Sequence, residues 1–324
     1  MAQVFCLGEA LIDRLLPWGD DPGRDCLGGA PANGACALAR LGTSAGFVGC
    51  LGRDPIGTAF AELFAQRGLD TSGLQWDEQR PSRVVLVERD ASGDRCFGGF
   101  DGDRGAGFAD TALAADQLPA GLGSGWLACG TIPLATPTSA LALEQAISRN
   151  RAGGGMLVLD VNWRPTFWGL AADAEPTAAI QQQMQPLLQQ ADLLKLAAEE
   201  AEGLFSSRDP QAVAAALPQR PAVVVTDGGK GVSWSMGGAA SGSLPAYRVP
   251  VVDTTGAGDA FLAGLLHRLV KEPNLLAGFD PSRVQQALQF ASACGALVCQ
   301  GAGAIDPQPA EAAVFAFIEQ QPAG

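Results

Sequence analysis

Short apolar segments of strand length alternate with longer periodic segments along most of this chain. The strand-like segments are 4–8, 46–51, 126–129, 156–161, 193–196 and 222–226. The helical candidates between them are 31–41, 55–67, 136–149, 177–190 and 211–217, and those of the last third of the chain are 257–270, 281–299 and 309–319. This alternation predicts an α/β fold with a central, mostly parallel sheet covered by helices on both faces.

One segment, 82–104, departs from the alternation. Two runs of β-forming residues, 83–89 and 95–100, flank 90–94, which has the Ser-Gly-Asp sequence of a hairpin turn. A further strand near 12–16 can join them. We therefore expect a small β-sheet lid, formed by about 11–26 and 82–104, on a single domain that spans 1–324. A lid with an apolar outer face can pair with the lid of a second copy, so a homodimer through the lid is one candidate assembly.

The charge balance restricts the partners of this chain. Thirty-four acidic residues against 21 basic ones give a net charge of −13, and no run of Lys or Arg stands out, so neither nucleic acid nor a membrane is expected as a partner. No apolar run is long enough to span a bilayer, and residues 1–16 lack the features of a signal peptide. Eight cysteines without a C-x-x-C pair are typical of buried thiols in a reducing compartment, so we expect a cytoplasmic protein.

The sequence DTTGAGDAF at 253–261 is the main candidate for chemistry. It follows a strand-like run, 249–252, and a helix is expected to begin near Ala257. A glycine turn that leads into a helix presents free backbone amides at the positive end of the helix dipole, so an acidic protein can bind an anion there without basic side chains. Asp259 would lie in the first turn, where it can accept a proton from a hydroxyl that attacks phosphorus. The alternative is a glycine turn with an aspartate that only stabilises the helix.

Two common nucleotide-binding motifs are absent from the sequence. There is no G-x-x-x-x-G-K-S/T string, and no G-x-G-x-x-G falls between a strand and a helix. Both absences argue against a P-loop ATPase and a dinucleotide-dependent dehydrogenase. The only histidine, His267, lies inside a predicted helix and needs no catalytic role.

The segment 253–261 resembles the C-terminal signature of the ribokinase-type (PfkB) carbohydrate kinases. GGAPAN at 28–33 resembles the N-terminal signature of the same family, and GCLGRDPIG at 49–57 is similar to its G-x-x-G-x-D-x-x-G segment. The likeness extends from Gly8 to about Pro307. It implies a ribokinase-like fold and an ATP-dependent sugar kinase.

The resemblance assigns roles to the matching positions. Asp259 would be the catalytic base, and the charge that develops on the transferred phosphoryl group would be held by the amides of Gly256, Ala257 and Gly258. The residues expected to bind sugar hydroxyls at these signatures are Asp13, Gly28, Gly29 and Asn33. Fixed polar groups suit a polyol, because such a site rejects analogues that lack a hydroxyl. Taken alone, Asn33 also fits a helix cap.

ATP is expected on a second glycine loop. TDGGKG at 226–231 resembles the family's T-x-G-x-x-G loop, in which glycines let the backbone approach the phosphates, although the segment by itself also fits an ordinary tight turn. The residues expected to bind ATP are Lys195, Thr226, Gly228, Gly231, Gly256 and Gly258.

The metal site departs from the family pattern. The family often has N-x-x-E after the strand that corresponds to 193–196, with a glutamate that organises Mg²⁺ through water. Here Ala197 replaces the polar residue and Glu200 keeps the acidic one. The alternative is that Glu199 and Glu200 are solvated charges in the first turn of a helix. Asp253 and Thr255 resemble the family's monovalent-cation loop, which makes K⁺ a further candidate ion.

Two further strings resemble the fructokinases of this family. GEALID at 8–13 is similar to the fructokinase start, and the segment 160–168 resembles D-x-N-x-R-x-x-x-W, which adds Asn162 and Arg164 to the expected sugar ligands. Arg164 alone also fits a surface position after a strand. The resemblance implies phosphorylation of D-fructose to fructose 6-phosphate. The alternatives are ribose, a nucleoside or 2-keto-3-deoxygluconate as substrate, and a non-catalytic regulator that binds a sugar or a nucleotide.

Overall fold

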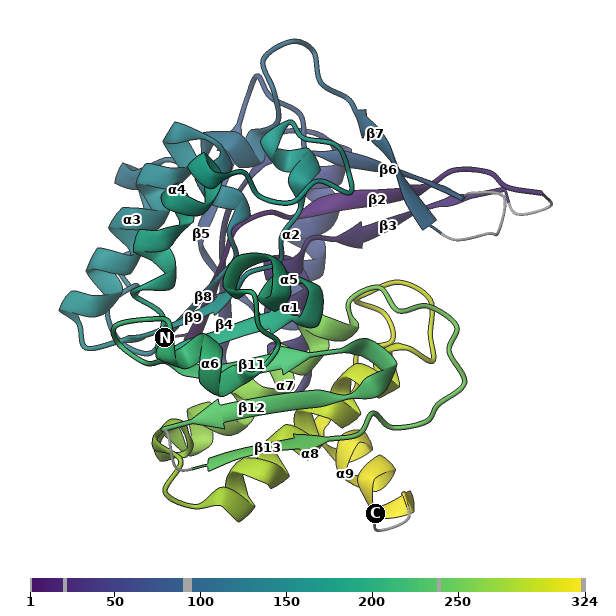
Figure 1. Ribbon diagram of the computed structural model, residues 1–324. Helices are drawn as coiled ribbons and strands as arrows, with labels where there is room; N and C mark the ends of the chain where they lie inside the picture. The colour runs from purple at the N-terminus through teal and green to yellow at the C-terminus, as the bar shows by residue number, and fades with distance from the viewer. Residues whose placement is uncertain (1, 20–21, 90–94, 238–239, 322–324) are drawn as a thin grey trace.

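The computed structural model describes residues 2–19, 22–89, 95–237 and 240–321, and its large sheet confirms the predicted α/β architecture (Figure 1). The nine strands follow the order β13-β12-β11-β10-β9-β8-β1-β4-β5. Neighbours from β5 to β11 are parallel, whereas β12 and β13 continue the sheet in antiparallel pairs. The strands are β1 (Val4–Leu7), β4 (Ala45–Gly52), β5 (Asp70–Asp77), β8 (Trp126–Cys129), β9 (Met156–Asp160), β10 (Leu193–Ala197), β11 (Ala222–Thr226), β12 (Val232–Met236) and β13 (Ala240–Leu244).

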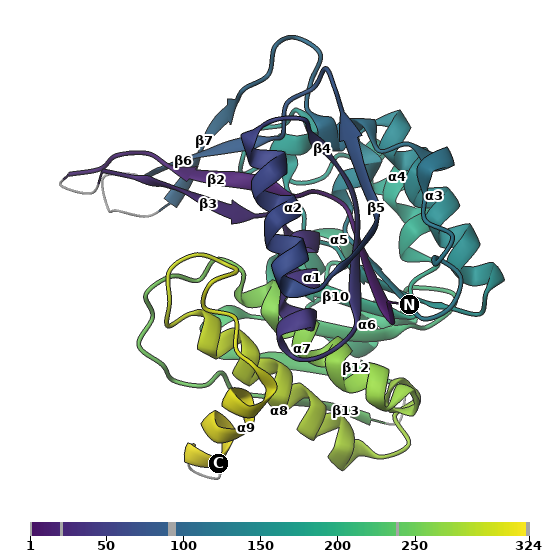
Figure 2. The ribbon, with the colours of Figure 1, turned by 180° about the vertical axis from the view of Figure 1, so that it is seen from behind.

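Helices cover both faces of this sheet (Figures 1 and 2). One face is covered by α1 (Ala30–Arg40), α2 (Pro55–Arg67), α7 (Ala257–Lys271) and α8 (Pro281–Val298), with α9 (Glu311–Gln320) packed on α8. The other face is covered by α3 (Pro137–Ala152), α4 (Ala178–Leu188), α5 (Ala198–Phe205) and α6 (Pro210–Ala215). In β1, Val4 and Cys6 belong to the first core, and Phe5 and Leu7 belong to the second. Strands buried on both faces must be apolar throughout, which is why the sequence shows them as continuous apolar runs.

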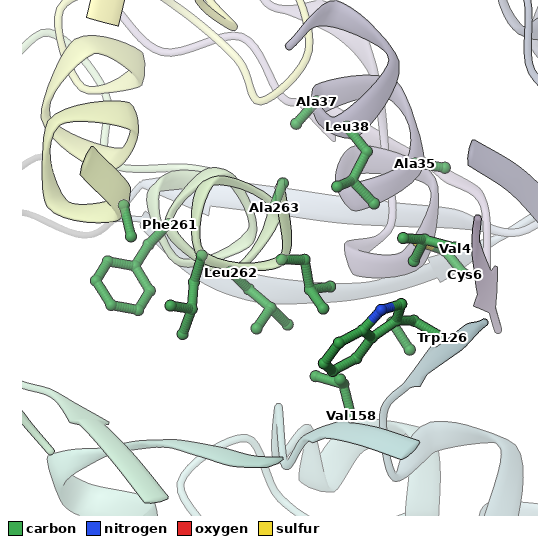
Figure 3. Packing of buried hydrophobic residues seen from close by; sticks show 14 of the residues in the cluster. Val4, Cys6, Ala35, Ala37, Leu38, Trp126, Val158, Phe261, Leu262 and Ala263 are labelled. Carbon is green, nitrogen blue, oxygen red and sulfur yellow. The ribbon is translucent and has the colours of Figure 1, made fainter. Parts of the chain in front are cut away.

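The first core fixes α1 and α7 to each other and to the sheet. Figure 3 shows Leu262 and Ala263 of α7 close to Leu38 of α1, above Trp126 and Val158 of the sheet. These five side chains are all buried. Because interiors are close-packed, the two helices have little freedom to move relative to one another.

The smaller sheet confirms the predicted lid. Its order is β3 (Arg24–Gly28), β2 (Leu11–Leu15), β6 (Val84–Arg89) and β7 (Arg95–Asp101), and β6 pairs with β7 in antiparallel fashion. The expected hairpin turn at 90–94 lies outside the described residues. Figures 1 and 2 both show the lid projecting sideways from the body, above the loop that precedes α9.

The predicted strand at 249–252 is wrong. This segment leaves the sheet after β13, and Val251 and Val252 are 62% and 65% exposed. Pro245 and Pro250 cannot donate to a strand ladder, and the amide of Val252 donates instead to the carbonyl of Cys299 at 2.8 Å. Asp253 is therefore positioned by contacts with the loop after α8.

Two sequence expectations concern the whole chain. Among the described residues, no helix has both the length and the apolar character needed to cross a membrane. The eight cysteines are free thiols, and five of them are buried. Cys96, on the lid strand β7, is exposed.

Candidate active site

The cleft lies where the parallel strands of the large sheet end. β1 has β4 on one side and β8 on the other, so the chain winds outward from β1 in both directions, and ligands of such sheets bind at this switch point. A cleft of about 1690 Å³, open solvent included, lies here under the lid. Of the predicted site residues, it is lined by Asp13, Gly29, Asn33, Asn162, Arg164, Lys195, Asp253, Thr255, Gly256, Gly258 and Asp259. The predicted residues that do not line it are Gly28, Ala257, Glu200, Thr226, Gly228 and Gly231.

The start of α7 has the glycine-turn geometry that the sequence predicts for an anion site. Gly256 caps the helix with φ 78°, and a Cβ there would lie 2.5 Å from the Cβ of Ala304, so only glycine fits this turn. The amide of Ala257 donates to the carbonyl of Thr254 at 3.2 Å. Within the described chain, the amides of Gly256 and Gly258 have no such partner. These two amides are the ones that the helix start leaves available for an anion.

Asp259 lies in the first turn of α7 and pairs with Asn33 of α1. The Asn33 side chain donates to Asp259 Oδ2 at 2.8 Å. Burial, the largest influence, raises the pKa of Asp259, and Asp160 adds to this, while Asn33, Lys195 and Arg164 lower it. The net shift is upward, which makes the carboxylate a better proton acceptor. Asn33 is not a helix cap, since Gly29 caps α1.

A buried ion pair lies beneath the start of α7. Lys195 Nζ donates to both carboxylate oxygens of Asp160, at 3.0 and 2.9 Å. A Cβ on Gly258 would lie 3.2 Å from Lys195 Nζ, so the ammonium faces the helix turn directly. Burial alone would lower the pKa of Lys195, but Asp160 and Glu200 outweigh it and the net shift is upward. The lysine therefore carries its positive charge beneath the start of α7.

The two lid residues of the expected sugar site depend on each other. Asp13 lies on β2 opposite Cys26, near Gly28 at the end of β3. A Cβ on Gly28 would lie 2.7 Å from Asp13 Oδ2. Gly28 therefore does not line the cleft but leaves the space in which the Asp13 carboxylate sits.

Sequence reasoning missed Glu9 as a site residue. It lines the cleft, is only 4% exposed, and accepts a hydrogen bond from the amide of Ala30 at 3.1 Å. Burial, with smaller effects from Asp110 and Asp259, raises the pKa of Glu9 to about 8. Its position after β1, the central strand of the switch point, is the signal that points to it. Asp160, the last residue of β9, was likewise not predicted as a site residue.

Glu200 connects two backbone segments rather than facing solvent. Its Oε1 accepts from the amide of Trp163 and its Oε2 from the amide of Ala197, both at 2.7 Å. Burial and Asp160 raise the pKa of Glu200. The alternative of two solvated charges is therefore wrong for Glu200 and correct only for the exposed Glu199. Both Glu200 carboxylate oxygens accept hydrogen bonds from backbone N–H groups, which fits contact with a metal through water better than direct ligation. The described residues contain no cluster of three metal-ligating side chains.

Asp253 fixes the loop that precedes α7. Its Oδ1 accepts from the backbone and the hydroxyl of Thr255 at 3.0 and 2.7 Å, and its Oδ2 accepts from the amide of Gly303 at 2.8 Å. The carboxylate thus joins the start of the DTTGAGD turn to the loop after α8.

The expected nucleotide loop follows β11. A short 3-10 turn, η5 (Gly228–Lys230), confirms a tight turn here, and Lys230 pairs with Asp227 at 3.2 Å. Thr226 donates through its hydroxyl to the carbonyl of Leu196 at 3.4 Å. The loop lies at the same edge of the sheet as Lys195, beyond the residues that line the cleft.

An α/β body, a β lid and a carboxylate beside a helix start are the features expected of a small-molecule phosphotransferase. The family model of the pfkB carbohydrate kinases matches residues 1–311. The chain therefore belongs to the pfkB family of carbohydrate kinases, and the predicted ribokinase-like fold is confirmed.

Relatives within this family include several fructokinases. The fructokinase of Klebsiella pneumoniae is 34% identical over 312 residues, which cover 95% of this chain and 96% of that protein. The fructokinase of Vibrio alginolyticus is 32% identical and covers 99% of this chain and 100% of its own. Among solved structures, the fructokinase of Xylella fastidiosa with bound ATP has a TM-score of 0.86 at 29% identity, with 100% of both chains covered. The aminoimidazole riboside kinase of Salmonella enterica, with its riboside and an ATP analogue, has a TM-score of 0.81 at 28% identity and covers 97% of this chain and 99% of its own.

Proposed function

We propose that this chain transfers the γ-phosphoryl group of ATP to the 6-hydroxyl of D-fructose. The observation that carries the proposal is the Asn33–Asp259 pair at the start of α7, next to two available amides. One carboxylate thus lies beside one anion site, which is the arrangement that hydroxyl phosphorylation requires. The fructokinase relatives support fructose as the acceptor.

Asp259 is the proposed base. Asn33 occupies its Oδ2 and fixes the plane of the carboxylate, so the other oxygen is oriented for a substrate hydroxyl. The raised pKa lets it accept the proton as the hydroxyl oxygen attacks phosphorus. The core packing of α1 against α7 holds the two residues at this distance.

The start of α7 stabilises the negative charge that develops on the transferred phosphoryl group. The amides of Gly256 and Gly258 lie at the positive end of the α7 dipole, and Lys195 adds a full charge beneath them. Ala257 can add its amide if it exchanges its 3.2 Å bond to Thr254. Each lost donor of this kind costs about 10²–10³ in rate.

Sugar recognition is assigned to groups from the lid and the body. Asp13 and Gly29 approach from the lid side, with Gly28 assigned to leave room for the Asp13 carboxylate, and Asn33, Asn162 and Arg164 approach from the body. These groups include both donors and an acceptor, as a polyol requires.

ATP is assigned to the outer part of the same sheet edge. Lys195, in the middle of β10, supplies a cation, and Thr226, Gly228 and Gly231 supply the glycine turn at the end of the neighbouring strand β11. A fructokinase structure with ATP and another from Vibrio cholerae with fructose, ADP and calcium support a nucleotide and a metal ion in this fold.

Glu200 is the residue assigned to Mg²⁺, through water. When bound, the ion neutralises charge on the nucleotide phosphates. Asp253 and Thr255 are assigned to a monovalent cation such as K⁺. A structure of the Vibrio cholerae fructokinase with potassium supports such an ion in this family.

The deciding experiment measures phosphate transfer from ATP to fructose, ribose, adenosine, aminoimidazole riboside and 2-keto-3-deoxygluconate. We expect fructose to have the highest kcat/KM. Transfer to another acceptor but not to fructose would contradict the substrate assignment. Asp259→Asn should lower kcat by about 10²–10⁴ without loss of fold, and near-normal turnover would exclude Asp259 as the base. Asp209→Asn, a change in the cap of α6 far from the cleft, is the matched control.

A second candidate is a riboside kinase, supported by the similarity to the aminoimidazole riboside kinase. The same panel separates the two. A non-catalytic regulator has less support, because a binding protein does not need a carboxylate with a raised pKa beside two available amides. Calorimetry that detects sugar binding, with no turnover in ATP and Mg²⁺, would favour it.

Two further proposals concern the setting of the reaction. The eight free thiols suit a reducing cytoplasm.

The lid strands leave edges at β3 and β7, and Trp18 next to the lid is 44% exposed, so pairing of two lids is the proposed route to a homodimer.

A further inference from the structure

A buried cation with three aromatic rings lies at the root of the lid. We call it the Arg83 cluster, and it consists of Arg83, Phe100, Phe108, Asp110 and Phe167. Arg83 donates to both carboxylate oxygens of Asp110, at 2.8 and 3.0 Å, and neither side chain is more than 8% exposed. The guanidinium carbon lies 4.7, 4.3 and 4.6 Å from the ring centroids of Phe100, Phe108 and Phe167.

The cluster joins the two sides of the cleft that the proposed function assigns to the sugar. The Arg83 carbonyl accepts from the amide of Ile12 at 3.0 Å, next to Asp13 on β2. On the other side, Phe167 donates through its amide to the carbonyl of Arg164 at 3.1 Å. One residue thus contacts the strand of one sugar ligand and the turn of another.

The cluster also borders the cleft itself. Phe167 and Glu9 line the cleft, and both also line a second cavity of about 370 Å³ whose walls include Arg83 and Asp110. Phe100 pairs with Val85 across the lid hairpin, so the same rings that hold the guanidinium belong to the lid and to the body. A displacement of the Arg83 guanidinium would therefore be transmitted to the sugar side of the cleft through the side chain of Phe167.

The contacts of the Arg83 cluster depend on the planar shape of the guanidinium group. A buried ion pair by itself adds little to stability, because both charges lose their hydration. A planar guanidinium, in contrast, bonds a carboxylate in two places and stacks on aromatic rings at the same time, which fixes its orientation. A lysine keeps the charge but can reproduce neither contact geometry.

We propose that Arg83 is a positioning residue for the sugar, which holds the Asp13 strand and the Arg164 turn at the separation that the substrate requires. The inference rests on the proposed function, since that function assigns Asp13 and Arg164 to the sugar. Arg83 acts through these residues and does not line the cleft itself.

The test is Arg83→Lys in the full chain, with separate KM measurements for sugar and ATP. We expect the sugar KM to rise about tenfold or more, because small displacements of substrate-positioning groups are costly. The KM for ATP should stay within about twofold, since Lys195 and the glycine loop are not part of the cluster. Arg14→Lys is the matched control: Arg14 also bonds a carboxylate twice, that of Asp25, and pairs with Asp101, but its side chain is 35% exposed, so both constants should stay within about twofold.

Hydrogen exchange gives a readout that needs no substrate. Arg83→Lys should speed exchange in 11–15 and 162–168 while α7 stays unchanged. Phe167→Leu keeps the ion pair and removes one ring, so it should raise the sugar KM in the same direction even where the lysine variant does not fold. An unchanged sugar KM, or an equal rise in the KM for ATP, would overturn the inference.

The failure of the proposed function has a different signature. A wild type that phosphorylates no compound of the panel would refute that function. Exchange would then still decide the inference, because unchanged rates at 11–15 and 162–168 in Arg83→Lys would exclude any positioning effect.

Discussion

Glu9 should make the folded state lose stability as the pH rises. Burial raises the pKa of Glu9 from its ordinary value of 4.5 to about 8 in the folded protein. Between these values the folded state binds a proton that the unfolded state has released, so the contribution of Glu9 is fully present below pH 4.5 and is lost as the pH rises through about 8. A rise of about 3.5 in pKa corresponds to roughly 5 kcal/mol, at about 1.4 kcal/mol for each pKa unit.

The assay is the free energy of unfolding by guanidinium titration between pH 5 and 9, for the wild type and Glu9→Gln. Glutamine keeps an acceptor for the Ala30 amide but cannot ionise. Relative to Glu9→Gln, the wild type should lose about 1.4 kcal/mol per pH unit up to about pH 8 and then level off. Glu62→Gln, an exposed position on α2, should differ from the wild type by a constant amount. A constant difference for Glu9→Gln as well would refute the reasoning.

Three further predictions concern the site. Asn33→Ala removes a hydrogen bond that lowers the pKa of Asp259, so the acidic limb of the kcat/KM profile should move to higher pH; an unmoved limb would show that Asp259 does not set it. Gly28→Ala places a methyl group 2.7 Å from an Asp13 carboxylate oxygen and should raise the sugar KM by about tenfold or more, with the ATP KM as the internal control. Lys195→Met leaves its buried carboxylate partner unpaired and should lower the free energy of unfolding by about 3–5 kcal/mol, whereas a loss below 1 kcal/mol would mean that water replaces the ammonium.

The interior parallel strands β1, β4, β8, β9, β10 and β11 were predictable because they are apolar on both faces. β11, with the sequence AVVVT, and β9, with MLVLD, can be read directly as strands. The edge strands β5 and β13 were not predicted, since DTSGLQWD and ASGSL are half-exposed and carry few apolar residues. The opposite error, a strand predicted where none forms, arose at 249–252, because its valines have the composition of a strand although the segment is exposed and pairs with no strand.

The candidate site was predictable where a signature supplied both partners. Asn33 and Asp259 are 226 positions apart, yet each lies in a signature, and the structure joins them. Lys195 was predicted without its partner Asp160, because that contact depends on which strands are neighbours. Arg83 could not be predicted from the sequence, since its partners come from the lid strand β7, the segment 108–110 and the turn at 165–168, which share no sequence spacing.

The packing of α1 against α7 has a consequence for how such an enzyme can change. Asn33 and Asp259 project from two helices, α1 and α7, whose other faces are buried in one apolar core. The packing of that core therefore sets the distance between the two side chains. Asp13 and Arg164, in contrast, stand on a lid strand and beside a surface turn. In the proposed function, chemistry and acceptor choice are therefore assigned to parts of the molecule that differ in how tightly they are packed. Mutations that retune the acceptor can accumulate at the periphery while the proton-transfer geometry is preserved, whereas a repacked interior would disturb turnover for every acceptor alike.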